Sequence, residues 1–277
     1  MKLDAHVHFW GRQELAVYEW MTDEMTAIRR PFAVDALRPL LAAHGFEACV
    51  VVQTYSSVEE TEAFVELARQ TDVVAGVVGW VDLTSPDISD TLAELRNPYL
   101  VGIRHQVHDE PDAEWLLRDD VRRGLRALER AGLAYDVLVK TRELPAALDT
   151  ARRFPDLPMV IDHIAKPPIA AGALEPWAQL MAPFAQLEHV RCKVSGLVTE
   201  ADWSRWRVDD LRPYVERVLE WFGEDRLIFG SDWPVCTLAA SYDEVVSACE
   251  DALGDVGGTA REKIFGGNAI SFYGLAV

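Results

Sequence analysis

Eight apolar, strand-like runs alternate with helical or loop segments along the chain, and this alternation predicts an α/β protein with a parallel sheet. Eight such units in 277 residues fit a closed (β/α)8 barrel, the TIM barrel, better than an open doubly wound sheet. An open sheet usually has an early glycine-rich phosphate turn, and no GxGxxG or P-loop motif follows any run. The sequence has no repeat, low-complexity tract or Pro/Gly-rich linker, so we expect a single domain over residues 1–277.

The expected strands are short, continuous apolar runs, as is typical of strands that are buried on both faces. They cover residues 3–10, 48–54, 73–81, 100–106, 134–140, 158–164, 190–197 and 226–232. Prolines follow the sixth run at 167–168 and the eighth run at 234, and proline disfavours continuation of a central strand.

The expected helices carry apolar residues at helical spacing. They cover residues 34–44, 57–70, 87–96, 112–131, 142–154, 174–187 and 208–222, with further helical stretches around 241–253 and 259–273. Gly45, Gly132 and Gly223 follow three of them, where glycine commonly ends a helix. Residues 11–30 are too irregular for a helix. A long loop after the first strand predicts either a wall or lid over a site, or a surface excursion whose aromatic side chains pack on the barrel.

The composition indicates a folded chain without nucleic-acid or membrane partners. Hydrophobic residues make up 49% of the sequence, which suffices for a core, and the net charge of −18 repels phosphate backbones and anionic lipids. No apolar run reaches membrane-spanning length and the start lacks a signal-peptide pattern, so we expect a cytoplasmic protein. Cys49, Cys192, Cys236 and Cys249 form no CxxC pair and are expected to be reduced thiols.

Polar side chains gather at the carboxyl ends of the expected strands, where the active site of a (β/α)8 barrel lies. In chain order they are His6, His8, Gln53, Trp80, Asp82, Arg104, His105, Lys140, His163, Lys166, Lys193, Ser195 and Asp232. Buried polar groups without partners cost about 1–3 kcal/mol each, so core packing alone does not explain such a ring. The sequence therefore predicts a functional site at this rim.

The first strand carries two histidines, His6 and His8, on either side of Val7. Strand side chains alternate between faces, so both imidazoles point the same way, with their Cα atoms roughly 7 Å apart. Two imidazoles at that spacing can converge on one metal ion or one water molecule. The alternative is a strand that carries two core histidines.

Several rim residues keep a structural alternative. Arg104 and His105 are adjacent on one strand, so only one of them points into the barrel, and the sequence does not say which. Lys140 and Lys193 are equally consistent with structural lysines that are paired or extend to the surface. His108 follows the fourth strand and is expected at the surface.

Seven motifs resemble those of one known family and occur in the same order over nearly the whole chain. They are DAHVHFW at 4–10, VVQ at 51–53, GIRH at 102–105, DHIAKP at 162–167, KVSGL at 193–197, FGSDWP at 229–234 and GNA at 267–269. Together they resemble the amidohydrolase superfamily, in the branch of metal-dependent-hydrolase-like barrels that contains sugar-acid lactonases and 2-pyrone-dicarboxylate lactonase. The combination is specific for this branch and much less specific for a substrate.

The resemblance implies a set of catalytic and metal-binding residues, namely His6, His8, His163 and Asp232. These residues suit one divalent ion, zinc or manganese. A two-metal centre is not expected, because the fourth strand has no lysine that could be carboxylated and no histidine ends the fifth strand. Some lactonases of this branch work without a metal, by the same resemblance, and that alternative stays open.

We therefore expect hydrolysis of a lactone, with Asp232 accepting a proton from the attacking water and passing it to the departing ring oxygen. The resemblance implies the lactone of a sugar acid, such as L-fucono- or L-rhamnono-lactone. Cations near the carbonyl and aromatic rings beside the sugar suit this substrate, so the expected substrate-binding residues are Gln53, Trp80, Arg104, His105, Lys166 and Trp233, with Trp10 also at the rim.

Three other functions remain as alternatives to lactone hydrolysis. They are hydrolysis of an amide or another ester, metal-dependent decarboxylation and, from a different class, sugar binding without catalysis. The intact set of histidines and Asp232 favours an enzyme over a binding protein, because binding alone does not need a general base opposite a histidine pair. The expected partner is a small-molecule substrate, and a homodimer is left open.

Overall fold

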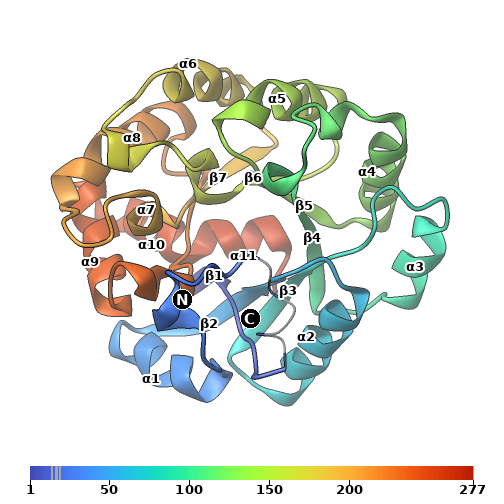
Figure 1. The fold of residues 1–277 in the computed structure, drawn as a ribbon, viewed down its shortest axis with the longest axis horizontal. Coiled ribbons are helices and arrows are strands. Elements are labelled where there is room, and N and C mark those ends of the chain that lie inside the picture. Colours follow the sequence, from blue (N-terminus) through green and yellow to red (C-terminus); the bar gives the residue numbers. More distant parts are fainter. Residues whose placement is uncertain (14, 16–17, 19, 277) are drawn as a thin grey trace.

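An eight-stranded parallel sheet in the order β1 to β8 lies at the centre of the computed structural model (Figure 1). The model describes residues 1–13, 15, 18 and 20–276, so residues 14, 16–17 and 19 of the loop expected at 11–30 lie outside the described residues. The strands are β1 (Lys2–Val7), β2 (Phe46–Val52), β3 (Val74–Gly79), β4 (Leu100–Gln106), β5 (Ala134–Leu138), β6 (Met159–Ile161), β7 (Val190–Val194) and β8 (Leu227–Phe229).

The junction of β1 and β8 closes the sheet into a barrel. Val7 pairs in parallel with Trp233, just beyond the end of β8. The Asp232 N–H donates to the His6 carbonyl at 2.9 Å, and the His8 N–H donates to the Trp233 carbonyl at 2.7 Å. The predicted (β/α)8 barrel is confirmed, and its closing hydrogen bonds join the segments that carry the two histidines and the aspartate.

Helices follow the strands and form the outer layer of the barrel (Figure 1). They are α1 (Val34–Ala43), α2 (Val58–Gln70), α3 (Ile88–Glu94), α4 (Asp119–Ala131), α5 (Leu144–Arg153), α6 (Trp177–Met181), α7 (Leu197–Glu200), α8 (Val208–Phe222), α9 (Tyr242–Leu253), α10 (Gly258–Glu262) and α11 (Asn268–Tyr273). Local sequence sets several of their ends. The Ser57 and Ser241 hydroxyls cap α2 and α9, while Gly132 ends α4 with a φ of 71°.

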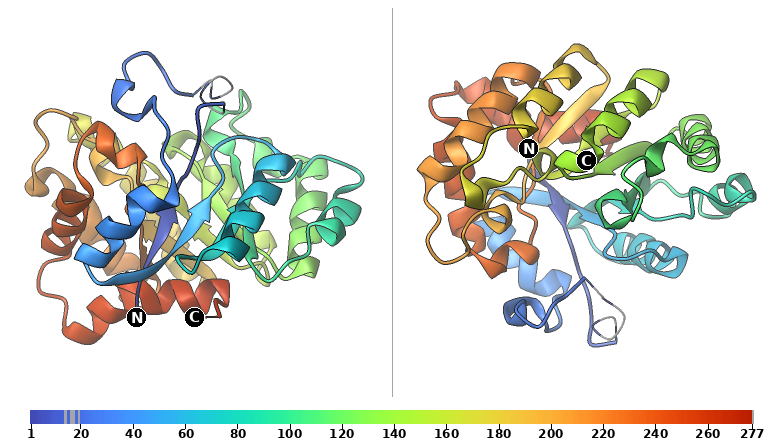
Figure 2. Two further views of the ribbon diagram at one scale, coloured as in Figure 1. Left: turned by 90° about the horizontal axis from the view of Figure 1, so that it is seen from below. Right: turned by 45° about the horizontal axis from the view of Figure 1, so that its top comes forward.

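The amino end of the barrel is apolar and is covered by the end of the chain. Leu3, Val50, Val160 and Ile228 belong to one buried cluster with Ala269, Tyr273 and Leu275 from and after α11. Figure 2 shows α11 running beneath the strands, at the end where both chain termini lie. The Asn268 side chain fixes this helix by donating to the Leu227 carbonyl at 2.7 Å.

Several predicted strands extend beyond the observed ones at the carboxyl end. The sixth was expected to reach residue 164 and stops at Ile161, and the eighth was expected to reach 232 and stops at Phe229. The chain then turns, because residues 163–166 and Asp232 all have positive φ. Apolar residues continue through the first of these turns, so hydrophobicity alone could not locate the end of the strand.

Two predicted helices are interrupted and one short helix was missed. The stretch expected as a helix over 112–131 contains a 3₁₀ turn (Trp115–Leu117) before α4, because Arg118 between them has extended backbone angles. The helix expected over 174–187 is α6 followed by a 3₁₀ segment (Ala182–Gln186) with proline in its first turn. The short helix α7 was expected to be strand and loop.

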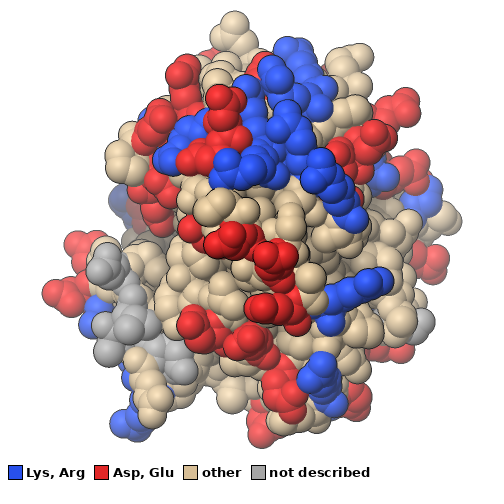
Figure 3. Space-filling model, turned by 90° about the vertical axis from the view of Figure 1, so that its right-hand side faces the viewer, with Lys and Arg blue, Asp and Glu red and all other residues tan. Residues whose placement is uncertain are grey.

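The charged residues are unevenly distributed on the surface. On the face shown in Figure 3, Lys and Arg side chains gather toward the top with some Asp and Glu beside them, and further Asp and Glu side chains form a band down the lower part. The four cysteines are free, as expected, and all four are buried. Among the described residues, no helix is both long enough and apolar enough to cross a membrane.

Candidate active site

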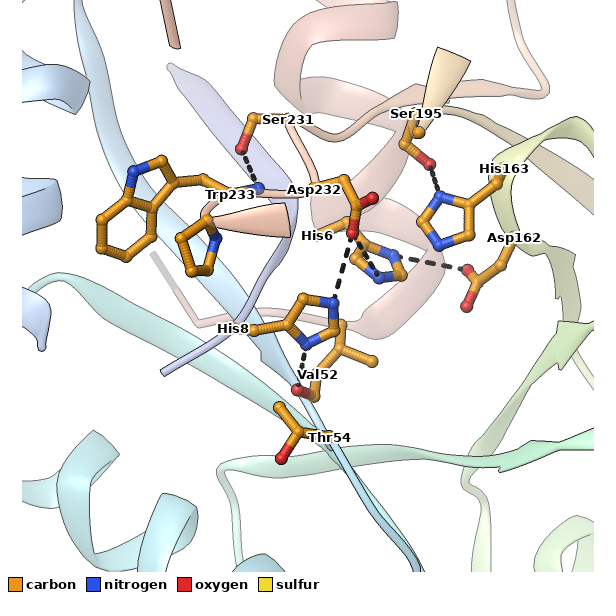
Figure 4. A network of polar contacts seen from close by, with 12 residues as sticks. His6, His8, Val52, Thr54, Asp162, His163, Ser195, Ser231, Asp232 and Trp233 are labelled. Carbon is orange, nitrogen blue, oxygen red and sulfur yellow. Dashed lines mark hydrogen bonds and ion pairs between the residues drawn. The ribbon is translucent and has the colours of Figure 1, made fainter. Parts of the chain in front are cut away.

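His6, His8 and Asp232 meet where β1 joins the segment after β8 (Figure 4). His8 Nε2 lies 3.3 Å from Asp232 Oδ1, and His6 Nε2 lies 3.9 Å from the same oxygen. All three side chains are buried. The expectation that both imidazoles point to one side of the strand is confirmed, since the two rings are edge to face with centroids 5.0 Å apart.

The ring of His8 is oriented by the backbone of β2. Its Nδ1 lies 2.7 Å from the Val52 carbonyl, so Nδ1 carries the proton and donates it. Burial lowers the pKa of His8, although Asp232 opposes the shift, so the ring is neutral near pH 7. The lone pair of Nε2 then faces a carboxylate oxygen 3.3 Å away. Two electron-pair donors at this distance repel each other unless a proton or a cation lies between them.

His6 lies deeper and contacts both a lysine and an arginine. Arg104 Nη1 lies 3.1 Å from His6 Nε2, and Lys193 Nζ lies 3.2 Å from His6 Nδ1. Burial and Lys193 lower the pKa of His6 well below its ordinary value, so the ring is neutral and has one lone pair. Asp162 Oδ1 also lies 3.5 Å from Nδ1. Both ring nitrogens of His6 therefore face a cationic donor, Lys193 at Nδ1 and Arg104 at Nε2, and the single lone pair of the neutral ring can accept from only one of them.

A network of buried charges supports His6 from below. Lys193 Nζ lies 2.5 Å from Asp136 Oδ2 and 3.0 Å from Asp162 Oδ1, and the Tyr273 hydroxyl from α11 donates to Asp136 at 2.7 Å. Burial raises the pKa of Asp136 to about 6. Burial also opposes ionisation of Asp162, but Lys193 and His6 hold the pKa of that carboxyl well below its usual range. The sequence left open whether Lys193 is paired or extends to the surface. The structure shows that it is fully buried and paired with Asp136 and Asp162.

A left-handed turn after β6 presents His163 and Lys166 to the site. Residues 163–166 have φ between 47° and 60°, which is rare for residues other than glycine. His163 Nδ1 lies 2.9 Å from Ser195 Oγ, and its ring lies 4.5 Å from that of His6. Gly196 makes room for this ring, because a Cβ atom there would lie 2.6 Å from His163 Nδ1. Lys166 Nζ forms an ion pair with Glu200 at 2.7 Å.

A cavity of about 340 Å³ opens above these residues at the carboxyl end of the barrel. His8, Arg104, His163, Lys166 and Asp232 reach it from the barrel. Its walls come from the loops and include Trp20, Met25, Thr54, Gln106, His108, Asp109, Lys140, Glu200 and Trp203. Trp20 and Met25 belong to the loop expected at 11–30, so this loop supplies part of the wall.

The structure separates the expected substrate-binding residues into two groups. Arg104 and Lys166 line the cavity. His105 faces the opposite side of β4, where it stacks on Trp115 with ring centroids 4.2 Å apart and accepts from Trp80 Nε1 at 3.0 Å. This resolves which of residues 104 and 105 points inward, and it places His105 and Trp80 outside the described lining of the cavity.

Gln53, Trp233 and Trp10 also lie outside that lining. Gln53 is fully buried beneath Arg104 and accepts its N–H groups. Trp233 packs in an aromatic cluster with Phe9 and Phe32, and Trp10 donates to the Arg30 carbonyl at 2.8 Å. Gln53 therefore positions Arg104, whereas the two tryptophans pack and bond within the segments beside the site.

Sequence reasoning missed several wall residues that come from loops. His108 was expected at the surface, but it lines the cavity, and burial lowers its pKa to about 3. Trp20, Trp203 and Glu200 were not singled out, because they stand in segments without a strand pattern. The available signal was their position: each lies in a connection that follows a strand's carboxyl end.

The donor set formed by His6, His8 and Asp232 fits a divalent metal ion. The three side chains offer ligand atoms within 4.8 Å of one another, as does a second group of His6, Asp162 and His163. Ligands about 2.0–2.2 Å from a tetrahedral zinc lie about 3.4 Å apart, which compares with 3.3 Å and 3.9 Å from Asp232 Oδ1 to the two histidines. His8 also has its second nitrogen fixed by a carbonyl, as is usual for metal-binding histidines.

Comparisons with known proteins cover almost the whole chain. The model of the amidohydrolase family matches residues 3–275. The chain is 43% identical to the L-fucono-1,5-lactonase of Burkholderia ambifaria, over 98% of this chain and 95% of that protein. It is 41% identical to the L-fucono-1,5-lactonase of Burkholderia multivorans, over 99% and 96%.

Among solved structures, an amidohydrolase from Burkholderia multivorans with bound zinc superposes with a TM-score of 0.95. The two chains are 39% identical and the match covers 99% of each. A probable 2-pyrone-4,6-dicarboxylic acid hydrolase from Acinetobacter baumannii has a TM-score of 0.84 at 19% identity, over 99% of each chain, and at this identity the likeness concerns the fold alone.

Proposed function

Because this chain belongs to the amidohydrolase family, we propose that it hydrolyses the lactone of a sugar acid, with L-fucono-1,5-lactone as the first substrate to test. Two relatives named for this activity are 43% and 41% identical to the chain over nearly its full length. The protein is thus a hydrolase that acts on a carboxylic ester bond. A cavity of about 340 Å³ has room for a single small molecule of this kind.

The observation that carries the reaction is a buried, ionised aspartate that borders the cavity beside a neutral histidine. Burial alone would raise the pKa of Asp232, but its surroundings, chiefly His163, hold it below the ordinary value. The carboxylate is therefore available at pH 7 to accept a proton. His8 and Asp232 both border the cavity, so a water molecule in the cavity can contact both groups.

In the proposed reaction this water attacks the lactone carbonyl carbon while one of its protons passes to Asp232. A new carbon–oxygen bond forms, and the carbonyl oxygen becomes an oxyanion, which a positively charged group beside it stabilises. Lys140 and Lys166 line the cavity and are the cations placed to do so. The bond from the carbonyl carbon to the ring oxygen then breaks. The ring oxygen takes the proton from Asp232, which leaves a hydroxy acid.

A divalent ion fits this site. His6, His8 and Asp232 would hold it, and an ion there would act as a Lewis acid and lower the pKa of a bound water. His8 and His6 present Nε2, Asp232 carries the proton, and His163 is oriented by Ser195.

The walls of the cavity match a polyhydroxylated ring. Trp20 and Trp203 supply apolar faces, while Gln106, Asp109 and Glu200 supply hydrogen-bonding groups. We propose that these loop residues, rather than Trp80, Trp233 or His105, contact the sugar, because they line the cavity. A single domain over residues 1–277, a homodimer and a cytoplasmic location also stay proposals, and the homodimer is tested by light scattering on the purified protein.

The test is proton release from a panel of sugar-acid lactones in a weakly buffered assay, using protein as purified and protein stripped by a chelator. We expect rapid opening of L-fucono-1,5-lactone or a close stereoisomer. If the chelator-treated protein still turns over the lactone, catalysis depends on the protein side chains alone. If turnover is lost and zinc or manganese restores it, catalysis depends on the metal-bound site. Turnover of an ester or amide panel without any lactone turnover would contradict the proposal.

A further inference from the structure

The guanidinium of Arg104 is fully engaged by neighbouring protein groups. Its Nη2 donates to the Gln53 carbonyl at 2.5 Å and to Gln53 Oε1 at 3.0 Å, and its Nε donates to Gln53 Oε1 at 3.3 Å. Its Nη1 donates to Asp162 Oδ2 at 3.2 Å and to His6 Nε2 at 3.1 Å. Five hydrogen bonds match the five N–H groups of an arginine, so Arg104 acts on the site through His6 and not through a free donor.

The contact with His6 uses an atom that a metal ion would also need. Neutral imidazole has one lone pair, and an arginine N–H beside Nε2 can only donate to that atom, so the contact with Arg104 uses the lone pair on Nε2. Zinc binds a histidine nitrogen at about 2.0–2.1 Å along that lone pair. The Arg104 N–H already points along it at 3.1 Å. One lone pair cannot serve both partners, and two positive charges at this separation repel each other.

We propose that Arg104 and a divalent cation are alternative partners of His6 Nε2, so that Arg104 sets the metal affinity of the site. When the guanidinium contacts His6, Arg104 supplies the positive charge that a metal ion would otherwise supply at Nε2. A metal ion enters only when Nη1 moves away from His6. The displacement disturbs the contacts of Arg104 with Asp162 and Gln53, both of which are fully buried. Metal affinity is therefore lower than the three ligands would give by themselves.

The experiment measures zinc binding to metal-free protein by competition with a chromophoric chelator. Arg104→Met removes the competing guanidinium, and Lys166→Met is the matched control. Lys166 is a cation that lines the same cavity but pairs with Glu200. We expect zinc to bind Arg104→Met at least tenfold more tightly than wild type, and Lys166→Met within about threefold of wild type. Equal tightening in both variants would mean only that removal of any cation favours zinc, and it would overturn the inference.

A second measurement uses the wild-type protein, so the inference stays testable if Arg104→Met does not fold. Crystal structures of metal-free and zinc-soaked protein report the distance from Arg104 Nη1 to His6 Nε2. We expect a hydrogen bond without zinc and separation beyond 3.5 Å with zinc on His6. Zinc bound to His6 Nε2 with the guanidinium unmoved, or zinc bound elsewhere in the cavity, would overturn the inference. The inference rests on the metal ligands named under the proposed function, but its readout is binding, so it fails or holds independently of lactone turnover.

Discussion

The two ends of the barrel are built from the same strands but differ in the side chains they bury. At the amino end, the cluster that includes Leu3, Val160 and Ile228 packs against α11 and contains only apolar and aromatic side chains. At the carboxyl end, histidines, carboxylates, a lysine and an arginine are buried together. Apolar burial stabilises the first end, whereas buried charge lowers stability unless it is paired. The comparison suggests that the amino end maintains the fold and the carboxyl end carries the chemistry.

The backbone shows the same division. Every described residue with positive φ that is not glycine follows β6 or β8 at the carboxyl end. Elsewhere in the described chain positive φ occurs at glycines, such as Gly132 after α4. A left-handed conformation costs roughly 1–2 kcal/mol for a residue with a Cβ atom. The site therefore holds strained backbone that the rest of the barrel avoids.

The largest expected effect comes from Asp232 at the carboxyl end. Asp232→Asn removes the proton acceptor, so we expect kcat for lactone opening to fall by about 10²–10⁴-fold, the range typical of a general base. The thermal midpoint should stay close to that of wild type, because the amide keeps the size of the side chain. Steady-state kinetics and a thermal melt check both expectations.

The matched control for this prediction is Asp109→Asn, which neutralises a carboxylate that lines the same cavity. Asp109 is proposed to contact the sugar but is not among the groups that meet His6 and His8, so its loss should raise KM and lower kcat less than tenfold. Equal losses of kcat in the two variants would contradict a special role for Asp232. They would mean that the site needs only negative charge near the cavity.

The opposite result is expected at the amino end. Leu3→Ala truncates a fully buried side chain in the apolar cluster. Substitutions of this kind cost about 2–5 kcal/mol, so urea unfolding should show a loss of that size. The value of kcat per folded molecule should remain that of wild type. A large fall in kcat at unchanged stability would show that the two ends are not separate in function.

The sequence predicted the amino end better than the carboxyl end, for a physical reason. Continuous apolar runs indicate buried strands, so the eight strands and their order could be predicted. The convergence of His6 and His8 could also be predicted, because strand side chains alternate between faces. Turns that leave regular structure follow other rules. Residues 163–164 of the left-handed turn at 163–166 follow an apolar run and were expected to continue its strand. The roles of Trp20 and Trp203 depend on loop geometry, which the pattern of a single sequence does not encode.

The pH dependence of stability should also come from the carboxyl half of the barrel. Asp4 accepts from the Ser231 N–H at 2.9 Å and from the Tyr242 hydroxyl at 3.0 Å, and so supports the turn that carries Asp232. Burial raises the pKa of Asp4 from 3.8 to about 6. The folded state therefore binds a proton more tightly than the unfolded state. The stability from this group is fully present below about pH 4 and is lost as the pH rises through about 6.

The size of this effect is about 3 kcal/mol, since each pKa unit corresponds to about 1.4 kcal/mol. Asp4→Asn is the comparison, because asparagine does not titrate. The free energy of unfolding of wild type, measured relative to Asp4→Asn in urea, should rise by up to this amount between pH 7 and pH 4. A difference that is constant with pH would mean that the burial of Asp4 does not perturb its ionisation.

The smallest expected effect isolates the strained backbone itself. Ala165 has a φ of 60° in the turn after β6, and Ala147 is a buried alanine within α5. Glycine adopts positive φ without a steric cost, whereas glycine inside a helix costs roughly 0.5–1 kcal/mol relative to alanine. Ala147→Gly should therefore destabilise the protein by about that amount. Ala165→Gly should be neutral or stabilising, because relief of strain offsets the greater freedom of the unfolded chain.

The free energies of unfolding of the two variants, measured in urea, should differ by about 1–2 kcal/mol. Equal losses would mean that the left-handed turn holds no strain, and the contrast between the two ends would then rest on buried charge alone.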